Sequence, residues 1–251
     1  MQYLRRTLLI VGTIIVLNFA FWSLTNPSAE ERPWGGLIDG LSYTPWRDNL
    51  RAELGRHADA AEIDANLAFL AQHARGVRTY GTNGGQDLIP KLAARHNLRV
   101  TLGIWIGSDP VANELEIANG IDIARNHPNV KRILVGNESL LRGDVGAEQL
   151  IDYIQRVQRQ ATVPVSTAEP WHIWEDHLEL MPVVDFIATH ILPYWEGVPI
   201  DRALQFVADR YGEIRQAHPD KHILIGEVGW PSEGQWFKGA EPSRINQAKF
   251  I

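Results

Sequence analysis

The sequence has no cysteine, no run of basic residues and no glycine-rich phosphate-binding motif. Without cysteine, its 251 residues form no disulfide, no thiol nucleophile and no thiolate metal site. A net charge of −6 with no basic cluster argues against nucleic acid as a partner. Neither G-x-G-x-x-G nor a P-loop follows any predicted strand, which argues against a nucleotide-binding enzyme.

The N-terminus does contain one long apolar run. Residues 7–24 are almost uniformly apolar, and two arginines precede them. The run is long enough to cross a bilayer, and the basic flank predicts that the segment after the run is exported. We therefore predict a membrane anchor over 1–24 and a linker over 25–35, with the rest on the periplasmic or extracellular side of the inner membrane. A cleaved signal peptide ending near Ala29 is the alternative.

From residue 36 onward, strand-like segments alternate with helical patterns. The predicted strands are 37–43, 76–80, 99–106, 130–136, 163–167, 184–192 and 222–228. Helical spacing of apolar residues marks three of the intervening helices, through Ile63, Leu67 and Leu70, through Leu150, Ile151, Ile154 and Val157, and through Ile200, Leu204, Val207, Tyr211 and Ile214. Continuously apolar strands followed by helices indicate a covered parallel sheet. Seven such repeats predict an α/β fold of the (β/α)₈ TIM-barrel type over residues 36–251.

The repeats stop at seven. Only residues 228–251 follow Glu227 of the seventh strand, and their last segment has the pattern of an opening helix. We therefore expect a barrel truncated after its seventh strand, either a fragment or a barrel that a downstream segment closes. In an open barrel, the first and seventh strands would keep unpaired edges.

Aromatic and acidic residues recur where the predicted strands end, and in such barrels the site is built at those ends. The strand ends deliver Tyr43 and Trp46; Arg78 and Tyr80; Trp105 and Asp109; Asn137 and Glu138; Glu169 and Trp171; His190, Tyr194, Trp195 and Glu196; and Glu227 and Trp230. Indole rings stack on the apolar faces of sugars, while carboxylates and arginine bond their hydroxyls. This pattern predicts a sugar polymer as substrate; the alternative is that the tryptophans only pack loops.

Glu138 and Glu227 lie at the ends of the fourth and seventh predicted strands, so their side chains should point across the barrel mouth. Two carboxyl groups about 5–5.5 Å apart would form a retaining glycosidase pair, one nucleophile and one acid/base. The charge of the nucleophile would raise the pKa of its partner, which would then stay protonated. The alternative for Glu138 is a first-turn helix residue favoured by the helix dipole.

Five segments resemble glycoside hydrolase family 17, the β-1,3-glucanases and β-glucan transglucosylases. They are VRTYGTN (77–83), RVTLGIWIG (99–107), VGNES (135–139), HILPYWEG (190–197) and GEVGWPS (226–232), of which the last is the most specific. The resemblance implies a retaining hydrolase or transglycosylase that acts on β-1,3-glucan, or remodels β-1,3/1,6-glucan outside the inner membrane. It implies no cofactor and no metal.

The resemblance also implies individual roles. Glu138 would be the acid/base, Glu227 the nucleophile, and Asn137 would bond the sugar 2-hydroxyl in subsite −1. Tyr194 would hold the nucleophile by a hydrogen bond. Tyr43, Arg78 and Tyr80 would line the same subsite, and Trp46, Trp105, Trp171, Trp195 and Trp230 complete the predicted sugar-binding residues.

Two alternatives remain open at this point. One is a catalytically silent glucan-binding module tethered to the membrane. The other is a metal hydrolase built on His172, Glu175 and His177, although histidines five residues apart do not share a helix face. We interpret His190, at an apolar strand end, as a residue that orients a carboxylate.

Overall fold

The computed structural model describes residues 2–25, 35–45 and 58–251. The chain divides into two compact units, Met1–Pro33 and Trp34–Ile251. Trp46 and most of the predicted linker lie outside the described residues.

The first unit contains helix α1 (Gln2–Thr25). Its Gln2–Leu24 stretch has a mean hydropathy of 2.1, and the helix is long and apolar enough to cross a membrane. A signal sequence at the N-terminus meets the same criterion. The predicted apolar segment is therefore one continuous helix, and it fits both interpretations made from the sequence.

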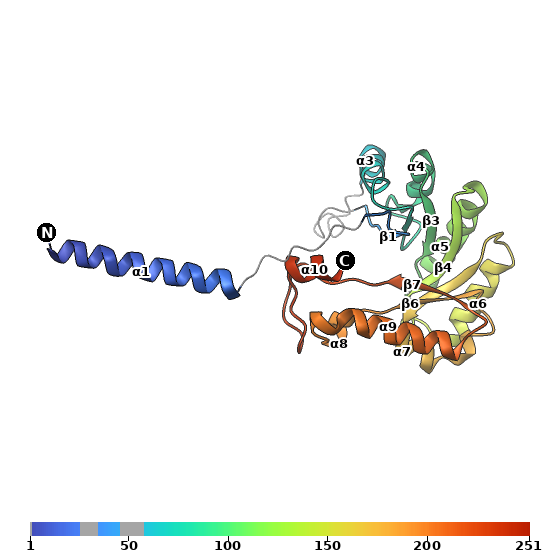
Figure 1. The fold of residues 1–251 in the computed structure, drawn as a ribbon. Coiled ribbons are helices and arrows are strands. Elements are labelled where there is room, and N and C mark those ends of the chain that lie inside the picture. The colour runs from blue at the N-terminus through green and yellow to red at the C-terminus, as the bar shows by residue number, and fades with distance from the viewer. Residues whose placement is uncertain (1, 26–34, 46–57) are drawn as a thin grey trace. The chain divides into compact units, whose positions relative to one another are not determined.

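The second unit is built on a seven-stranded parallel sheet. The strands are β1 (Leu41–Ser42), β2 (Gly76–Arg78), β3 (Arg99–Ile104), β4 (Val130–Asn137), β5 (Val165–Pro170), β6 (Phe186–His190) and β7 (His222–Glu227). Their spatial order follows the chain, with each strand parallel to the next. The sheet curls into a half-barrel with β1 and β7 at its edges (Figure 1). The predicted barrel-type fold with seven strands is confirmed.

Helices connect the strands. They are α3 (Ala60–Leu70), α4 (Ile89–Arg95), α5 (Pro110–Asn126), α6 (Ala147–Gln158), α7 (Trp171–Asp176), α8 (Pro193–Glu196), α9 (Ile200–Ala217) and α10 (Arg244–Phe250), with single turns at Gln86–Leu88 and Leu178–Leu180. The Asp59 carboxylate accepts the Glu62 N–H and starts α3, and Asp109 accepts the Val111 N–H and starts α5. Asp109 is thus a helix cap at its strand end.

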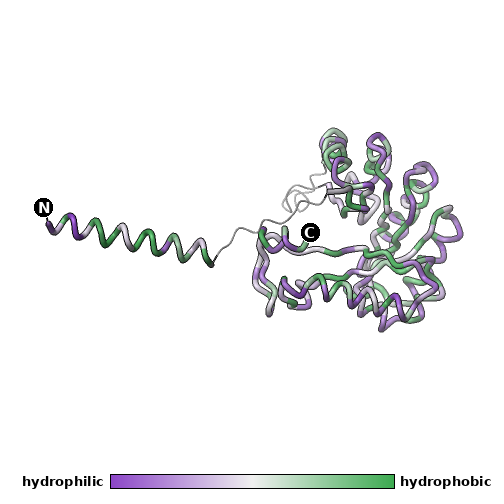
Figure 2. Tube along the Cα trace, in the orientation of Figure 1, coloured by the Kyte–Doolittle hydropathy of each residue, from purple (hydrophilic) through white to green (hydrophobic). Residues whose placement is uncertain are grey.

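The core lies between the sheet and the helices. Leu150, Ile154 and Val157 of α6 are fully buried, as the helical spacing predicted. The strands carry much of the hydrophobic sequence (Figure 2). This packing fixes the sheet, and with it the strand ends that carry the candidate site.

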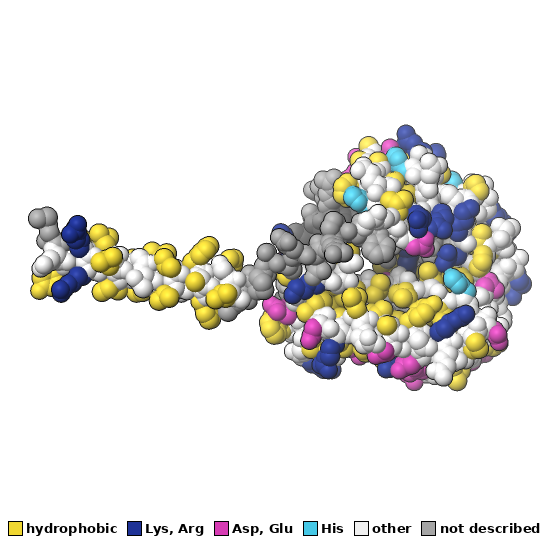
Figure 3. Space-filling model, in the orientation of Figure 1, with side chains coloured by type: hydrophobic (Ala, Val, Ile, Leu, Met, Phe, Trp, Pro, Cys, Tyr) yellow, Lys and Arg dark blue, Asp and Glu magenta, His cyan; other side chains and the backbone are white. Residues whose placement is uncertain are grey.

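Helix α9 departs from its predicted apolar face. Of the five residues that marked the stripe, only Ile214 is buried, and Leu204 is 58% exposed. Leu204 and Val207 instead line a cavity of about 1000 Å³ that strands β1, β2, β3 and β7 also border. Figure 3 shows this face of the unit hollowed, with hydrophobic and basic side chains around the hollow. In the chain, α9 connects β6 to β7, and β7 has a neighbouring strand on one side only.

Alanine substitutions at two glycines should change the free energy of unfolding in opposite directions. A Cβ at Gly103 of β3 would lie 2.3 Å from the Thr79 carbonyl oxygen, so Gly103→Ala must separate the backbones of neighbouring strands. We expect a loss of about 1–3 kcal/mol in the free energy of unfolding. Gly212, inside α9, has open space at its Cβ position, and Gly212→Ala should add roughly 0.5–1 kcal/mol. Urea unfolding of both variants checks the pair; an unchanged Gly103→Ala would contradict the packing.

Candidate active site

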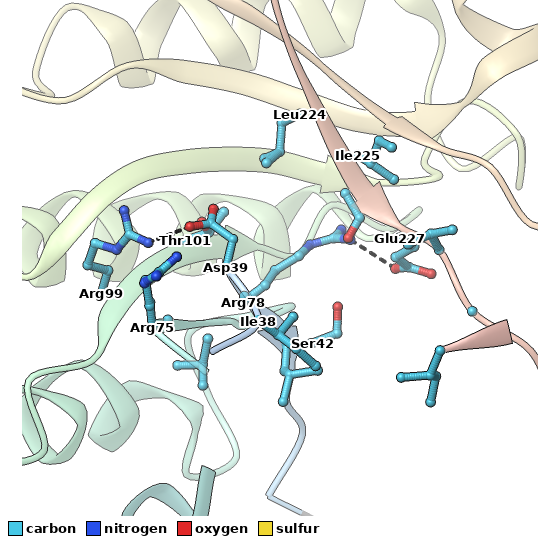
Figure 4. A pocket seen from close by; sticks show the side chains of 18 of the residues that line it. Ile38, Asp39, Ser42, Arg75, Arg78, Arg99, Thr101, Leu224, Ile225 and Glu227 are labelled. Atoms are coloured by element: carbon cyan, nitrogen blue, oxygen red, sulfur yellow. Dashed lines mark hydrogen bonds and ion pairs between the residues drawn. The ribbon is translucent and has the colours of Figure 1, made fainter. Parts of the chain in front are cut away.

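The guanidinium of Arg78 lies at the centre of a buried polar cluster formed by four strand ends. Arg78 is 6% exposed. Its Nη1 donates to Glu227 Oε1 at 3.0 Å (Figure 4) and to the Gly226 carbonyl at 2.8 Å, and its Nη2 donates to Asn137 Oδ1 at 2.5 Å. Removing a charge from water costs several kcal/mol unless a partner offsets it. Arg78 and Glu227 are such partners, which explains how a carboxylate is tolerated at the end of an apolar strand.

Asn137 is oriented by the same cation. A guanidinium has only donors, so the oxygen of the Asn137 amide must face Arg78. The NH₂ end of the amide therefore points away from Arg78. Because Asn137 also lines a cavity, it can donate to a ligand hydroxyl there.

His190 bridges the two predicted catalytic carboxylates. Its Nδ1 lies 2.7 Å from Glu138 Oε1, and its Nε2 lies 3.1 Å from Arg78 Nη1 and 3.7 Å from Glu227 Oε1. Because Arg78 can only donate, Nε2 is the acceptor and the imidazole proton is on Nδ1, from which it is donated to Glu138. The interpretation that His190 orients a carboxylate is confirmed.

Glu138 and Glu227 meet at the mouth of the half-barrel. One carboxylate oxygen of each and a ring nitrogen of His190 all lie within 4.8 Å of one another. This separation fits a retaining pair at about 5–5.5 Å and not an inverting pair at about 6.5–9.5 Å. Glu138 has the left-handed backbone angle φ 54°, two residues after Gly136 at φ 87°, so a tight turn ends β4 and aims the carboxylate.

The charge state of Glu138 differs from the expectation. The hydrogen bond from His190 lowers the pKa of Glu138 below its ordinary value, more than burial raises it, and Arg142 and Arg78 lower it further. The sequence argument considered only the repulsion between the two carboxylates. Donors and cations around Glu138 outweigh that repulsion, so the structure favours an ionised Glu138.

Tyr80 contacts Glu227, a contact that the resemblance assigned to Tyr194. The Tyr80 hydroxyl is hydrogen-bonded to Ser42 and Glu227, and burial together with the charge of Glu227 raises its pKa to about 12. The Tyr194 hydroxyl instead donates to the Gln235 carbonyl. Tyr194 packs among Trp230, Phe237 and neighbouring residues, which explains why it points away from the carboxylate.

A cavity of about 490 Å³, a size typical of small-ligand sites, opens beside Glu227 and Asn137, the neighbour of Glu138. Its lining residues are Ser42, Thr44, Tyr80, Gln86, Trp105, Asn137 and Glu227. Trp105 is 40% exposed, and Arg142 covers one part of the ring at 4.3 Å from its centroid. The larger cavity shares Arg78, Tyr80 and Glu227 but extends to the sheet edges. We take the smaller one as the candidate site because Asn137 and Trp105 also line it.

The remaining predicted aromatic residues have different surroundings. Tyr43 belongs to the buried core, where Asn66 donates to its hydroxyl, and Trp230 is buried against Tyr194 and Phe250. Neither residue lines the smaller cavity, because both rings are buried in the interior of the unit. Trp195 is 65% exposed, and Trp171 is partly buried with Arg210 over its ring.

Two buried carboxylates near the site had no assigned role in the sequence analysis. Glu116 of α5 accepts the backbone N–H groups of Thr82 and Trp105 at 2.8 and 3.1 Å. Glu169, at the end of β5, is completely buried and accepts the N–H of Leu140 at 2.9 Å. The sequence signal for Glu169 is an acidic residue at a strand end, and the signal for Glu116 is an acidic residue within a predicted helical segment. Neither signal identifies a role near the site.

The metal alternative gains no support from this geometry. His177 pairs with Glu179, and the described residues do not bring it together with His172 and Glu175 as a set of ligands. The described residues do bring Glu138, His190 and Glu227 together. The Arg78 guanidinium already lies within hydrogen-bond distance of two of them, so a metal ion there would face a cation.

The chain is similar to curated proteins that are named as glucan-degrading enzymes. The chain is 29% identical over 219 residues to the "Probable glucan endo-1,3-beta-glucosidase btgC" of Aspergillus clavatus, which covers 79% of this chain and 31% of that protein. The chain thus spans about a third of the length of this curated relative.

Solved structures are also similar. The glycoside hydrolase family 17 β-1,3-glucanosyltransferase of Rhizomucor miehei is 26% identical, with a TM-score of 0.75, covering 85% of this chain and 79% of that one. An active-site mutant of that enzyme in complex with laminaritriose gives a TM-score of 0.73 at the same identity and coverage. The resemblance to family 17 seen in the sequence is confirmed.

The family model described as the BtgE/BtgC glycoside hydrolase domain matches residues 40–251. This match covers well over half of the sequence. The chain therefore belongs to the BtgE/BtgC glycoside hydrolase domain family.

Proposed function

We propose that this chain is a retaining β-glucan enzyme, a hydrolase or transglycosylase acting on β-1,3-linked glucose units. The observation that carries the proposal is the approach of Glu138 and Glu227 to within 4.8 Å at the mouth of a parallel half-barrel. The names of the relatives, a glucan endo-1,3-beta-glucosidase and a β-1,3-glucanosyltransferase, support the substrate class. The laminaritriose bound to the Rhizomucor enzyme mutant supports it as well.

The reaction begins with Glu227 as nucleophile. Its carboxylate attacks the anomeric carbon while Glu138 gives a proton to the departing glycosidic oxygen, so that the C–O bond breaks and a glycosyl ester forms. Arg78 and Tyr80, both bonded to Glu227, hold the attacking carboxylate in place. Glu138 then removes a proton from the incoming water or sugar hydroxyl, which displaces Glu227 and restores the β configuration.

The choice between water and a sugar acceptor follows from what surrounds the glycosyl ester. Trp105 lines the cavity and is partly exposed, and Trp195 is largely exposed. Indole faces that hold a second sugar would exclude water and favour transfer. We propose that Asn137, which lines the same cavity, bonds the 2-hydroxyl of the sugar in subsite −1.

We further propose that residues 36–251 form the catalytic domain and that α1 anchors it to the inner membrane, joined by a linker over residues 25–35. The support is the length and hydropathy of α1 and the two arginines that precede its apolar run. The catalytic domain would then lie on the periplasmic or extracellular side, where it meets extracellular glucan.

Product analysis tests the activity. The protein in detergent should cleave or lengthen linear β-1,3-gluco-oligosaccharides, as seen by chromatography of the products. Glu227→Gln should abolish turnover because no nucleophile remains, and Glu138→Gln should lower it about 10²–10⁴-fold because leaving-group protonation is lost. Binding without turnover by the unsubstituted protein would favour the silent glucan-binding module instead. Unchanged turnover in Glu227→Gln would overturn the assigned roles.

The pH dependence tests the contact between His190 and Glu138. The first step needs Glu138 protonated, so kcat/KM should fall as the pH rises through the lowered pKa of this carboxyl. His190→Phe removes the donor, which raises that pKa and should move the alkaline limb of kcat/KM to higher pH. His218→Phe, at the end of α9, is the control and should leave the limb in place. An alkaline limb that stays put or moves to lower pH in His190→Phe would contradict the assignment.

A further inference from the structure

The loop that carries Glu138 is held in a costly conformation. Glu138 itself is left-handed, which costs roughly 1–3 kcal/mol for a residue other than glycine. Gly136 is left-handed as well, and a Cβ there would lie 2.7 Å from Ser139 Oγ. Contacts from the rest of the protein must therefore stabilise the turn that starts at Gly136.

Strand β5 supplies two of these contacts side by side. The Ala168 carbonyl accepts the N–H of Glu138 at 2.8 Å. The next residue, Glu169, accepts the N–H of Leu140 through Oε1 at 2.9 Å and the N–H of Leu141 through Oε2 at 3.4 Å. The carboxylate thus binds the amides of the second and third residues after Glu138 and holds the end of this turn.

Two acceptor oxygens are needed for this arrangement. A glutamine side chain has one carbonyl oxygen, and its NH₂ group would face the second amide donor. Burial and the charge of Glu138 raise the pKa of Glu169 to about 7, against the two amides and Arg142, which lower it. The fully buried carboxylate is therefore costly, and its partners lie in the segment that contains Glu138.

We infer that Glu169 is a positioning residue for Glu138: by binding the Leu140 and Leu141 amides, it fixes the turn that aims Glu138 at the leaving-group oxygen. The inference rests on the proposed function. Among the described residues, Glu169 does not line the smaller cavity, and its hydrogen bonds go to the amides of Leu140 and Leu141 and not to Glu227. We therefore expect its effect to fall on proton donation and not on nucleophilic attack.

Two substrates separate these steps. A β-1,3-gluco-oligosaccharide needs a proton on its leaving oxygen, whereas a 2,4-dinitrophenyl β-laminaribioside releases an acidic phenol that needs none. The value of kcat/KM reports the first step, in which the glycosidic bond breaks. Glu169→Gln should lower kcat/KM about 10–100-fold for the oligosaccharide and leave kcat/KM nearly unchanged for the dinitrophenyl substrate. Glu138→Gln should show the same selectivity, more strongly.

Glu116→Gln is the matched control. Glu116 is also a buried carboxylate that binds backbone amides, but those of Thr82 and Trp105. Its loss should lower kcat/KM for both substrates by similar factors. The unfolding temperature of each variant shows that it is folded; if Glu169→Gln is not, Glu169→Asp, which keeps the charge but shortens the reach, takes its place in the same test.

Equal losses on both substrates in the Glu169 variant, or no loss on either, would overturn the positioning role while the proposed function stands. An unsubstituted protein that turns over neither substrate would overturn the proposed function, and the inference with it. A selective loss in the Glu169 variant, absent from Glu116→Gln, supports the inference.

Discussion

One buried cation organises the site. Arg78 comes from β2, and through its guanidinium it contacts residues from β4, β6 and β7. These contacts set the acceptor nitrogen of His190, the orientation of the Asn137 amide and the position of the Glu227 carboxylate. A neutral side chain at position 78 would leave the partly buried Glu227 carboxylate without its cation, and breaking a fully buried ion pair costs about 3–5 kcal/mol.

Around this cation, the two predicted catalytic carboxylates have different surroundings. Glu227 is bonded to Arg78 and Tyr80, both of which hold its carboxylate in place. Glu138 is bonded to His190 and lies on a turn that Glu169 closes. A nucleophile and an acid/base need different neighbours. The lowered pKa of Glu138 is the reverse of what a resident general acid has, so in these surroundings Glu138 must take up a proton before the first step.

The fold could be predicted well from the sequence because apolar residues recur with different spacings in strands and in helices. Seven apolar segments became seven parallel strands, and the pair Glu138 and Glu227 followed from counting repeats between them. Helix α9 was the exception: its apolar spacing is helical, but Leu204 is exposed and lines the larger cavity instead of packing in the core.

The details of the site were harder to predict. Just past a strand end, no periodicity says whether a ring turns inward, so Tyr43 and Trp230 were expected in the cavity and lie in the interior. The partner of Glu227 proved to be Tyr80 and not Tyr194, because packing among aromatic residues directs Tyr194 to Gln235. His190 meets Glu138 where the pairing of β6 with β7 shifts register and where the backbone turns left-handed after β4, and neither feature leaves a clear mark in the sequence.

The stereochemistry of the first product tests the central claim most directly, since it reports on the distance between Glu138 and Glu227 in the working protein. Proton NMR can follow the anomeric signals while a β-1,3-gluco-oligosaccharide is cleaved, before mutarotation mixes them. Two carboxylates this close leave no room for a water between them, so the β anomer should form first. If the α anomer formed first, water would have attacked directly, and Glu138 and Glu227 would not act as the nucleophile and acid/base of a double displacement.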